Sequence, residues 1–243
     1  MPCVCCSNFH IQVREETFQG IYLPKIKGST RILMHIHGGG FVSGSPETSS
    51  TYLLQLSTEL QARGFVADIF SIRYDLSPEA PFPTALRQVC AAYEYLRSQG
   101  KPIILVGESA GGNLCLAFLV HLYRKQKGIA PEARSCPDIV GVYLSSPWIN
   151  LEAGSKAFHD TQQLDCLDSG ALKRWRNAYI GDRSLDEYAS PMMVSEGWDK
   201  ILPPNMCIMS GDLDLLKDDI LTLASTVEEV CITNTSVLSL HIN

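Results

Sequence analysis

The sequence predicts an α/β protein in which helices cover both faces of a mostly parallel β-sheet. Continuous apolar runs, such as residues 31–36 and 103–106, have the character of strands buried on both faces. Segments with apolar residues at helical spacing alternate with these runs, which is the order that β-α-β units require. No repeat or low-complexity linker divides the 243 residues, so residues 1–243 are expected to form one domain.

The expected strands are short apolar runs bounded by polar residues, proline or glycine. One or two extended segments are expected within residues 9–23, ahead of the main sheet. The remaining strands are expected at residues 31–36, 65–72, 102–107, 139–147, 205–211 and 231–240.

The expected helices lie between these strands and carry their own stop signals. Gly64, Gly100 and Gly128 each follow an apolar periodic segment, where glycine commonly ends a helix. Proline near the start of the second helix suits a first helical turn. Helices are expected at residues 52–64, 81–100, 110–127, 169–180 and 217–230, and the rest of residues 148–190 is irregular.

The composition argues against several classes of protein. A formal net charge of −6, without a run of Lys or Arg, is unfavourable for a nucleic-acid-binding surface. No segment reaches the roughly 18 apolar residues of a transmembrane helix, and the N-terminus lacks the features of a secretory leader. We therefore expect a cytoplasmic protein with no nucleic-acid partner and no transmembrane segment. The sequence leaves its oligomeric state open.

The nine cysteines are odd in number, and most stand singly in apolar runs, as reduced and buried thiols do. Cys3, Cys5 and Cys6 form a cluster for which we considered a zinc site. No second pair of Cys or His follows at the spacing of metal ligands, so no metal is predicted.

The run ILVGESAGGNL, residues 104–114, ends a strand and starts a helix within a few residues. Ser109 lies between Gly107 and Gly111 in the pattern G-x-S-x-G, which holds a serine at a sharp strand-to-helix turn. The glycines leave room where side chains would collide. The helix that follows directs the partial positive charge of its N-terminus at a ligand beside Ser109. Ser109 is therefore predicted to be a nucleophile.

The run HIHGGGF, residues 35–41, places three glycines after another buried strand. Backbone N–H groups can turn inward there, and acyl transfer needs such donors for the negative oxygen of its tetrahedral intermediate. A phosphate-binding loop is the alternative, but such a loop would end in Lys followed by Ser or Thr. The segment FVSGSPETSS, residues 41–50, contains no Lys, so an oxyanion hole is favoured.

The run SGDLDLLKDD, residues 210–219, follows a third strand and supplies a carboxylate. A serine nucleophile needs a histidine base, and an acid must orient that histidine. In proteins that hold the nucleophilic serine at such a strand-to-helix turn, these residues occur in the order Ser, acid, His. Asp214 is the preferred acid and Asp212 the second choice, because Asp218 and Asp219 suit the first turn of the next helix.

Five segments together resemble the hormone-sensitive-lipase-like family of α/β-hydrolase esterases. They are HGGGF (37–41), RYDLSPEAPFPTAL (73–86), GESAGGNL (107–114), SSPWINL (145–151) and SGDLDLLKDD (210–219). The resemblance covers about residues 30–220. It implies the α/β-hydrolase fold with an eight-stranded sheet, no cofactor, and hydrolysis of carboxylic esters through an acyl-serine.

Carried over position by position, the resemblance implies that Ser109 is the nucleophile and Asp214 the orienting acid. The N–H groups of Gly39, Gly40 and Ala110 would form the oxyanion hole. Glu108 replaces an acidic residue often found beside the serine, and we interpret it as supporting.

The base must come from six histidines, and His241 is the best candidate. His35, His37 and His121 lie in a strand, the glycine loop and a helix interior, while His10 precedes the sheet and His159 lies in the irregular region. His241 follows Asp214 by 27 residues, after a helix and the last expected strand. The family usually continues with a final helix, and it usually carries an N-terminal cap segment. Both are expected to be missing here.

Two functions follow from this pattern. The first is a serine hydrolase for esters of small to medium acyl groups, with a small-molecule ester as its partner and deacetylation of a metabolite as one form of it. Amides and lactones share the same intermediate. The second is a small-ligand binding protein or a truncated inactive copy, since plant gibberellin receptors resemble this family and lack the histidine.

Substrate choice is expected to lie in a lid of about residues 152–200. Phe41 and Trp148 are predicted to be substrate-binding walls of the acyl pocket, although aromatic residues often only fill a core. Further candidates are Phe158, Trp175, Tyr179 and Met192.

Overall fold

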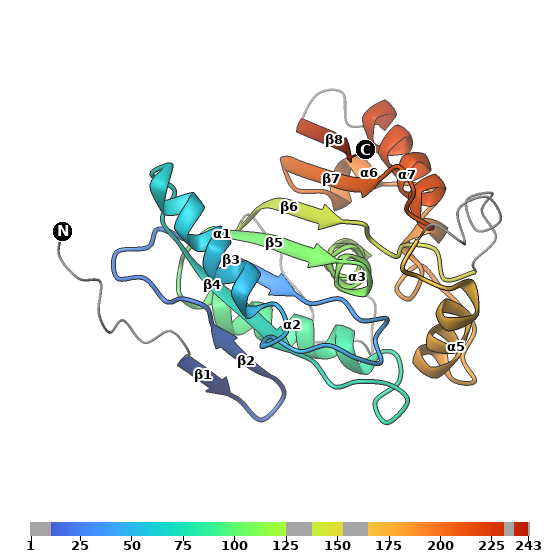
Figure 1. Ribbon diagram of the computed structural model, residues 1–243, viewed down its shortest axis with the longest axis horizontal. Coiled ribbons are helices and arrows are strands. Elements are labelled where there is room, and N and C mark those ends of the chain that lie inside the picture. Colours follow the sequence, from blue (N-terminus) through green and yellow to red (C-terminus); the bar gives the residue numbers. More distant parts are fainter. Residues whose placement is uncertain (1–10, 125–137, 153–164, 231–235, 243) are drawn as a thin grey trace.

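A computed structural model describes residues 11–124, 138–152, 165–230 and 236–242 (Figure 1). Its centre is an eight-stranded sheet with the order β1-β2-β4-β3-β5-β6-β7-β8. The first two strands, β1 (Ile11–Arg14) and β2 (Gln19–Tyr22), join the sheet antiparallel. All later neighbours pair in parallel. The mostly parallel sheet predicted from the apolar runs is therefore confirmed.

The parallel strands are β3 (Arg31–Ile36), β4 (Ala67–Arg73), β5 (Ile103–Glu108), β6 (Ile139–Ser145), β7 (Asn205–Gly211) and β8 (Ser236–Ile242). The helices are α1 (Ser50–Ala62), α2 (Thr84–Arg97), α3 (Ala110–Arg124), α5 (Ser169–Ile180), α6 (Trp198–Ile201) and α7 (Lys217–Val230), with a short 3₁₀ turn η1 (Pro191–Met193).

Helices cover both faces of the sheet, as predicted. Leu53 of α1 packs with Leu33 and Val106 in a smaller cluster on one face. The larger cluster contains the alternate strand residues and the buried sides of α2 and α3 on the other face. Residues 110–121 of α3 are all buried, which is typical of a helix enclosed by the core rather than lying on it. The turn before α3 is thereby held on every side.

The last strand differs from its expected position. It was predicted at residues 231–240, but β8 spans Ser236–Ile242 and residues 231–235 lie outside the described part. His241 is thus part of the sheet ladder, opposite Ser210 of β7, instead of following the strand. Leu238, Leu240 and Ile242 alternate with polar residues, and this alternation explains why the strand continues past Leu240.

Within the described ranges, no helix combines the length and apolar character that crossing a membrane requires. The cluster Cys3, Cys5 and Cys6 lies outside the described residues, as do His10, Phe158 and His159.

Candidate active site

Ser109 occupies the turn between β5 and α3 with a φ of 51°. A positive φ is unfavourable for a residue with a side chain and persists only where the surroundings impose it. Three backbone hydrogen bonds do so here. The Ser109 N–H donates to Ser145 O at 3.0 Å, and its carbonyl accepts the N–H groups of Asn113 at 3.1 Å and Trp148 at 3.0 Å. The serine is therefore held at the apex of the elbow.

The glycines around Ser109 are required by close packing. A Cβ on Gly111 would lie 2.0 Å from the carbonyl oxygen of Ile36 in β3. A Cβ on Gly107 would lie 2.6 Å from Gly111 O and 2.7 Å from the Cys115 sulfur. The first turn of α3 thus approaches the end of β3 more closely than any side chain permits, which brings Ser109 toward the glycine loop.

The glycine loop, residues 37–44, folds so that its own N–H groups are available. Gly39 and Gly40 have φ values of 110° and 62°, and Gly39 O accepts the N–H groups of Val42 at 3.1 Å and Ser43 at 3.0 Å. In the described part of the chain, the N–H groups of Gly39, Gly40 and Ala110 have no hydrogen-bond acceptor. They can therefore serve as donors to a ligand oxygen.

Two buried rings, those of His37 and Tyr74, stack on each other and support the glycine loop. His37 stacks on Tyr74 with ring centroids 4.2 Å apart, and its Nδ1 is 2.8 Å from the Gly38 carbonyl oxygen. The Tyr74 hydroxyl donates to His37 O at 2.9 Å. Burial lowers the pKa of His37, so the ring is neutral and Nδ1–H donates to Gly38 O. His37 thus shapes the loop.

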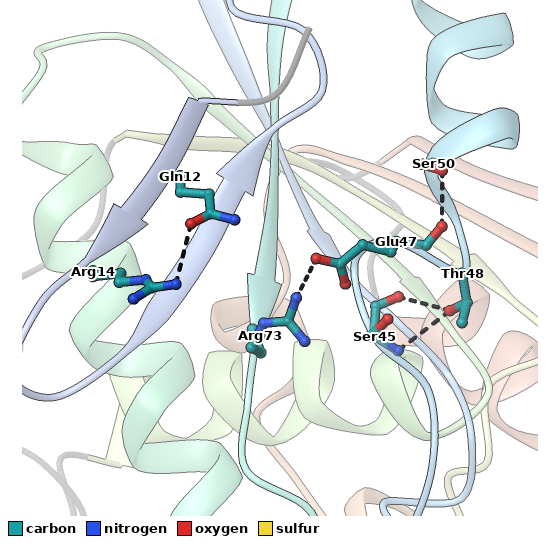
Figure 2. Close-up of polar contacts among 7 residues, drawn as sticks. All are labelled: Gln12, Arg14, Ser45, Glu47, Thr48, Ser50 and Arg73. Carbon is teal, nitrogen blue, oxygen red and sulfur yellow. Dashed lines mark hydrogen bonds and ion pairs between the residues drawn. The ribbon is translucent and has the colours of Figure 1, made fainter.

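The far end of the glycine loop is tied to the sheet by polar contacts (Figure 2). Arg73, the last residue of β4, pairs with Glu47. The Thr48 hydroxyl donates to Ser45 O at 2.7 Å and accepts Ser45 N–H at 3.2 Å. The Ser50 hydroxyl donates to Glu47 O at 2.8 Å. These bonds close the turn that leads from the glycine loop into α1.

Asp214 lies in the loop after β7 and presents one carboxylate oxygen with no protein partner. Its Oδ1 accepts the Leu216 N–H at 2.8 Å. Its Oδ2 is buried, and no described residue forms a hydrogen bond with it. An unpaired buried carboxylate oxygen is costly, so this oxygen suits the N–H of a histidine. Asp219 also has a buried Oδ2 without a partner in the described part of the chain, but its Oδ1 accepts an N–H of Asn150 at 3.1 Å and it does not line the cavity described below.

Ser109, Gly39, Gly40 and Asp214 all line one cavity of about 540 Å³. This volume is within the usual range for small-molecule sites. The other lining residues come from the end of β5, the loop after β6, the segment before α5, α5 itself, and the end of β7 with the loop that follows it. They are Glu108, Ser146, Asp165, Cys166, Leu167, Trp175, Gly211, Asp212, Leu213 and Leu216.

Three histidines have described side chains, and each is buried where it cannot act as the base for Ser109. Burial lowers the pKa of His35 to about 3, and its Nδ1 lies 2.8 Å from the Ser71 hydroxyl. His37 braces the glycine loop, and His121 lies in the buried part of α3. The backbone of His241 lies at the carboxyl end of β8, beside the strand that leads to Asp214. Its side chain is outside the described part.

Phe41 and Trp148 differ from their predicted role as substrate-binding walls. Both are fully buried, and neither lines the cavity. Phe41 stacks on Tyr179 at 3.7 Å and lies 5.7 Å from Trp148. They form an aromatic layer inside the core, because the glycine loop turns inward at Phe41, which has a φ of 65°. Trp175 is the aromatic residue that faces the cavity, and a Cβ on Gly40 would lie 2.4 Å from its ring.

Residues 33–238 match a protein-family model described as the alpha/beta hydrolase fold. The chain belongs to this α/β-hydrolase family. It is 30% identical over 221 residues to an esterase of Acinetobacter venetianus, covering 87% of this chain and 67% of that one. An acetyl-hydrolase of Streptomyces hygroscopicus is 34% identical over 196 residues, covering 78% of this chain and 59% of that protein.

Among solved structures, a hormone-sensitive lipase from a metagenome library superposes with a TM-score of 0.78 at 26% identity. The match covers 95% of this α/β hydrolase and 74% of that chain. The expected resemblance to hormone-sensitive-lipase-like esterases is therefore confirmed, and the alternative of a binding protein is not favoured. The chain spans about two thirds or less of the two curated relatives named here.

Proposed function

We propose that this α/β hydrolase cleaves carboxylic esters of small to medium acyl groups. Ser109 is the nucleophile, His241 the base and Asp214 the acid that orients the base. The observation that carries the proposal is that Ser109, the glycine loop and Asp214, which come from three separate strand ends, line one cavity. Acyl transfer requires a nucleophile, an oxyanion site and an acid in this proximity.

In the proposed reaction, His241 takes the proton of the Ser109 hydroxyl while Oγ attacks the ester carbonyl carbon. The alcohol leaves with the proton from His241, and the acyl group stays on Ser109. Water, deprotonated by His241, then attacks the acyl-serine. Collapse of the second intermediate releases the carboxylic acid and returns the proton to Ser109. Asp214 Oδ2 would accept a hydrogen bond from His241 and stabilise the imidazolium.

The negative oxygen of each intermediate is proposed to bind the N–H groups of Gly39, Gly40 and Ala110. One such donor can contribute about 3 kcal/mol to stabilising the transition state. These groups have no protein acceptor in the described part of the chain, so no internal hydrogen bond has to break when substrate binds. The N-terminus of α3 adds a favourable partial positive charge at the same place.

The cavity supports an acyl group of limited size. Trp175 lies against Gly40 on one side, and the exposed Leu213 contributes an apolar wall on the other. We propose that residues 152–200 act as the lid of a single domain. An acetyl group is a small acyl group of the kind proposed, and the name of the Streptomyces relative agrees with it.

We also propose a cytoplasmic location, supported by the free thiols of Cys90, Cys115, Cys166 and Cys207.

The proposal is tested with p-nitrophenyl esters of increasing chain length. The wild-type protein should hydrolyse acetate and butyrate, and Ser109→Ala should lose at least about 10⁴-fold in kcat. Asp214→Asn and His241→Ala should each lose about 10³-fold or more. Ser98→Ala, at the end of α2, is a matched serine control and should leave the rate unchanged. A folded wild-type protein without ester turnover would instead support a ligand-binding protein.

A further inference from the structure

We infer that Asp165 is a positioning residue that holds the acid loop, residues 211–216, in its working geometry. The inference rests on the proposed function. Asp165 precedes α5 in the lid region, whereas Asp214 is almost fifty residues further along the chain. Both residues line the same cavity. A hydrogen bond joins the two segments, and it ends one residue from the proposed acid.

The link is made by the Asp165 carboxylate, which accepts the backbone N–H of Leu215 at 2.6 Å. The next N–H, that of Leu216, donates to Asp214 itself at 2.8 Å. Consecutive N–H groups of the acid loop thus bind two different carboxylates. Hydrogen bonds to ionised acceptors are short and stronger than neutral ones. The Asp165 bond therefore fixes the backbone from which the Asp214 side chain projects.

Asp165 is itself anchored, so it can restrain the acid loop. Its Oδ1 accepts the N–H of Leu167 at 2.9 Å, which sets the orientation of the carboxylate. Asp168, three residues further along the chain, caps α5 by accepting the Ala171 N–H at 2.9 Å. The same helix carries Trp175, whose ring lies against Gly40 of the glycine loop. Through α5, Asp165 connects the acid side of the cavity with its oxyanion side.

Asp165 also adds a negative charge beside the proposed acid. A hydrogen bond to Asp165 raises the pKa of the Cys166 thiol, and burial and the charges of Asp165 and Asp214 act in the same direction. Both carboxylates therefore act on the same small region of the cavity. The other ionisable side chains that line it are Glu108 and Asp212. On the neighbouring turn, the Lys217 ammonium donates a hydrogen bond to Asp212 O at 2.5 Å.

A negative charge in this region favours the imidazolium form of the base. Removing that charge should lower the pKa of the base, and the acidic limb of the pH–rate profile should then move to lower pH. Removing the hydrogen bond should instead loosen Asp214 and lower kcat, because a displacement of about 1 Å can cost about 100-fold in rate. The charge and the hydrogen bond can therefore be separated by substitution.

The experiment compares Asp165→Ala with Asp165→Asn, using ester hydrolysis over a range of pH. Asp165→Ala loses both the charge and the acceptor, and we expect kcat to fall about 10- to 100-fold with a smaller change in KM. Asp165→Asn keeps an acceptor oxygen, and we expect kcat within about threefold of wild type with the acidic limb at lower pH. Asp168→Asn is the matched control, because it changes a neighbouring carboxylate that does not contact the acid loop.

Hydrogen exchange of the peptide that covers residues 211–217 gives a readout independent of catalysis. This peptide should exchange faster in Asp165→Ala than in Asp165→Asn or Asp168→Asn. The inference is overturned if Asp165→Ala leaves the exchange of this peptide unchanged, or if both Asp165 variants keep the wild-type kcat and pH profile. A wild-type protein without esterase activity would refute the proposed function, and the exchange measurement would still decide whether Asp165 holds the loop.

Discussion

Gly111→Ala is expected to be destabilising and to impair catalysis, although an alanine usually stabilises a helix. In the interior of an exposed helix, glycine to alanine gains about 0.5–1 kcal/mol. Here the added Cβ would lie 2.0 Å from Ile36 O and 2.6 Å from His37 O. Carbon–oxygen contacts are normally no closer than about 3.3 Å. Backbone must therefore move by about 1 Å, since neither neighbour is the end of a flexible side chain.

The size of the effect follows from this displacement. Forcing extra volume into a packed core costs about 1–3 kcal/mol, so the free energy of unfolding should fall by about that amount. Because α3 begins directly after Ser109 and β3 leads into the glycine loop, the shift would separate the nucleophile from the oxyanion donors. A misplacement of about 1 Å corresponds to a loss of about 100-fold in kcat.

The assay is urea denaturation followed by circular dichroism, together with p-nitrophenyl acetate hydrolysis. Gly100→Ala is the matched control, because Gly100 has a φ of 67° and no atom within 4 Å of an added Cβ. It should lose about 1–2 kcal/mol from backbone strain alone and keep its kcat. If Gly111→Ala were as stable and as active as wild type, the close approach of α3 to β3 would not position the site.

Three further predictions concern the cavity wall, the loop support and the dependence of stability on pH. Trp175→Ala should raise the ratio of octanoate to acetate hydrolysis several-fold, and an unchanged ratio would show that Trp175 does not limit the acyl group. Tyr74→Phe should lower the free energy of unfolding by about 1 kcal/mol, since the hydroxyl bond to His37 O is lost; unaltered urea unfolding would argue against this bond. His35 has its pKa lowered by burial from 6.5 to about 3, so its neutral form stabilises the fold above pH 6.5, and this contribution is lost as pH falls toward 3. His35→Gln should therefore reduce the slope of stability against pH in that window, by up to about 1.4 kcal/mol per pH unit, and an identical slope would contradict the assignment.

Much of the fold could be predicted from local patterns. β3, β7, α5 and α7 have the predicted boundaries, because unbroken apolar runs and helical periodicity report burial directly. The elbow and the glycine loop were also recognisable, because the steric need for glycine at these positions can be inferred from the neighbouring strand and helix patterns. The end of β8 was misjudged because histidine carries no strong strand preference.

The roles of single side chains were harder to predict. Phe41 and Trp148 were expected in the pocket, but an aromatic residue near a glycine loop can face the cavity or the core, and only the turn at Phe41 decides between them. No sequence pattern pointed to the role of Asp165, because its partner Leu215 is distant in sequence and contributes only a backbone N–H. Contacts of this kind depend on tertiary structure and leave no spacing pattern in the chain.

The most direct measurement is to find which residue becomes covalently modified by a fluorophosphonate. After brief treatment of the folded protein, proteolysis and mass spectrometry should locate the adduct on the peptide that carries Ser109, with no labelling of Ser109→Ala. A folded protein that stays unmodified, or one labelled at another residue such as Cys166, would contradict Ser109 as an activated nucleophile.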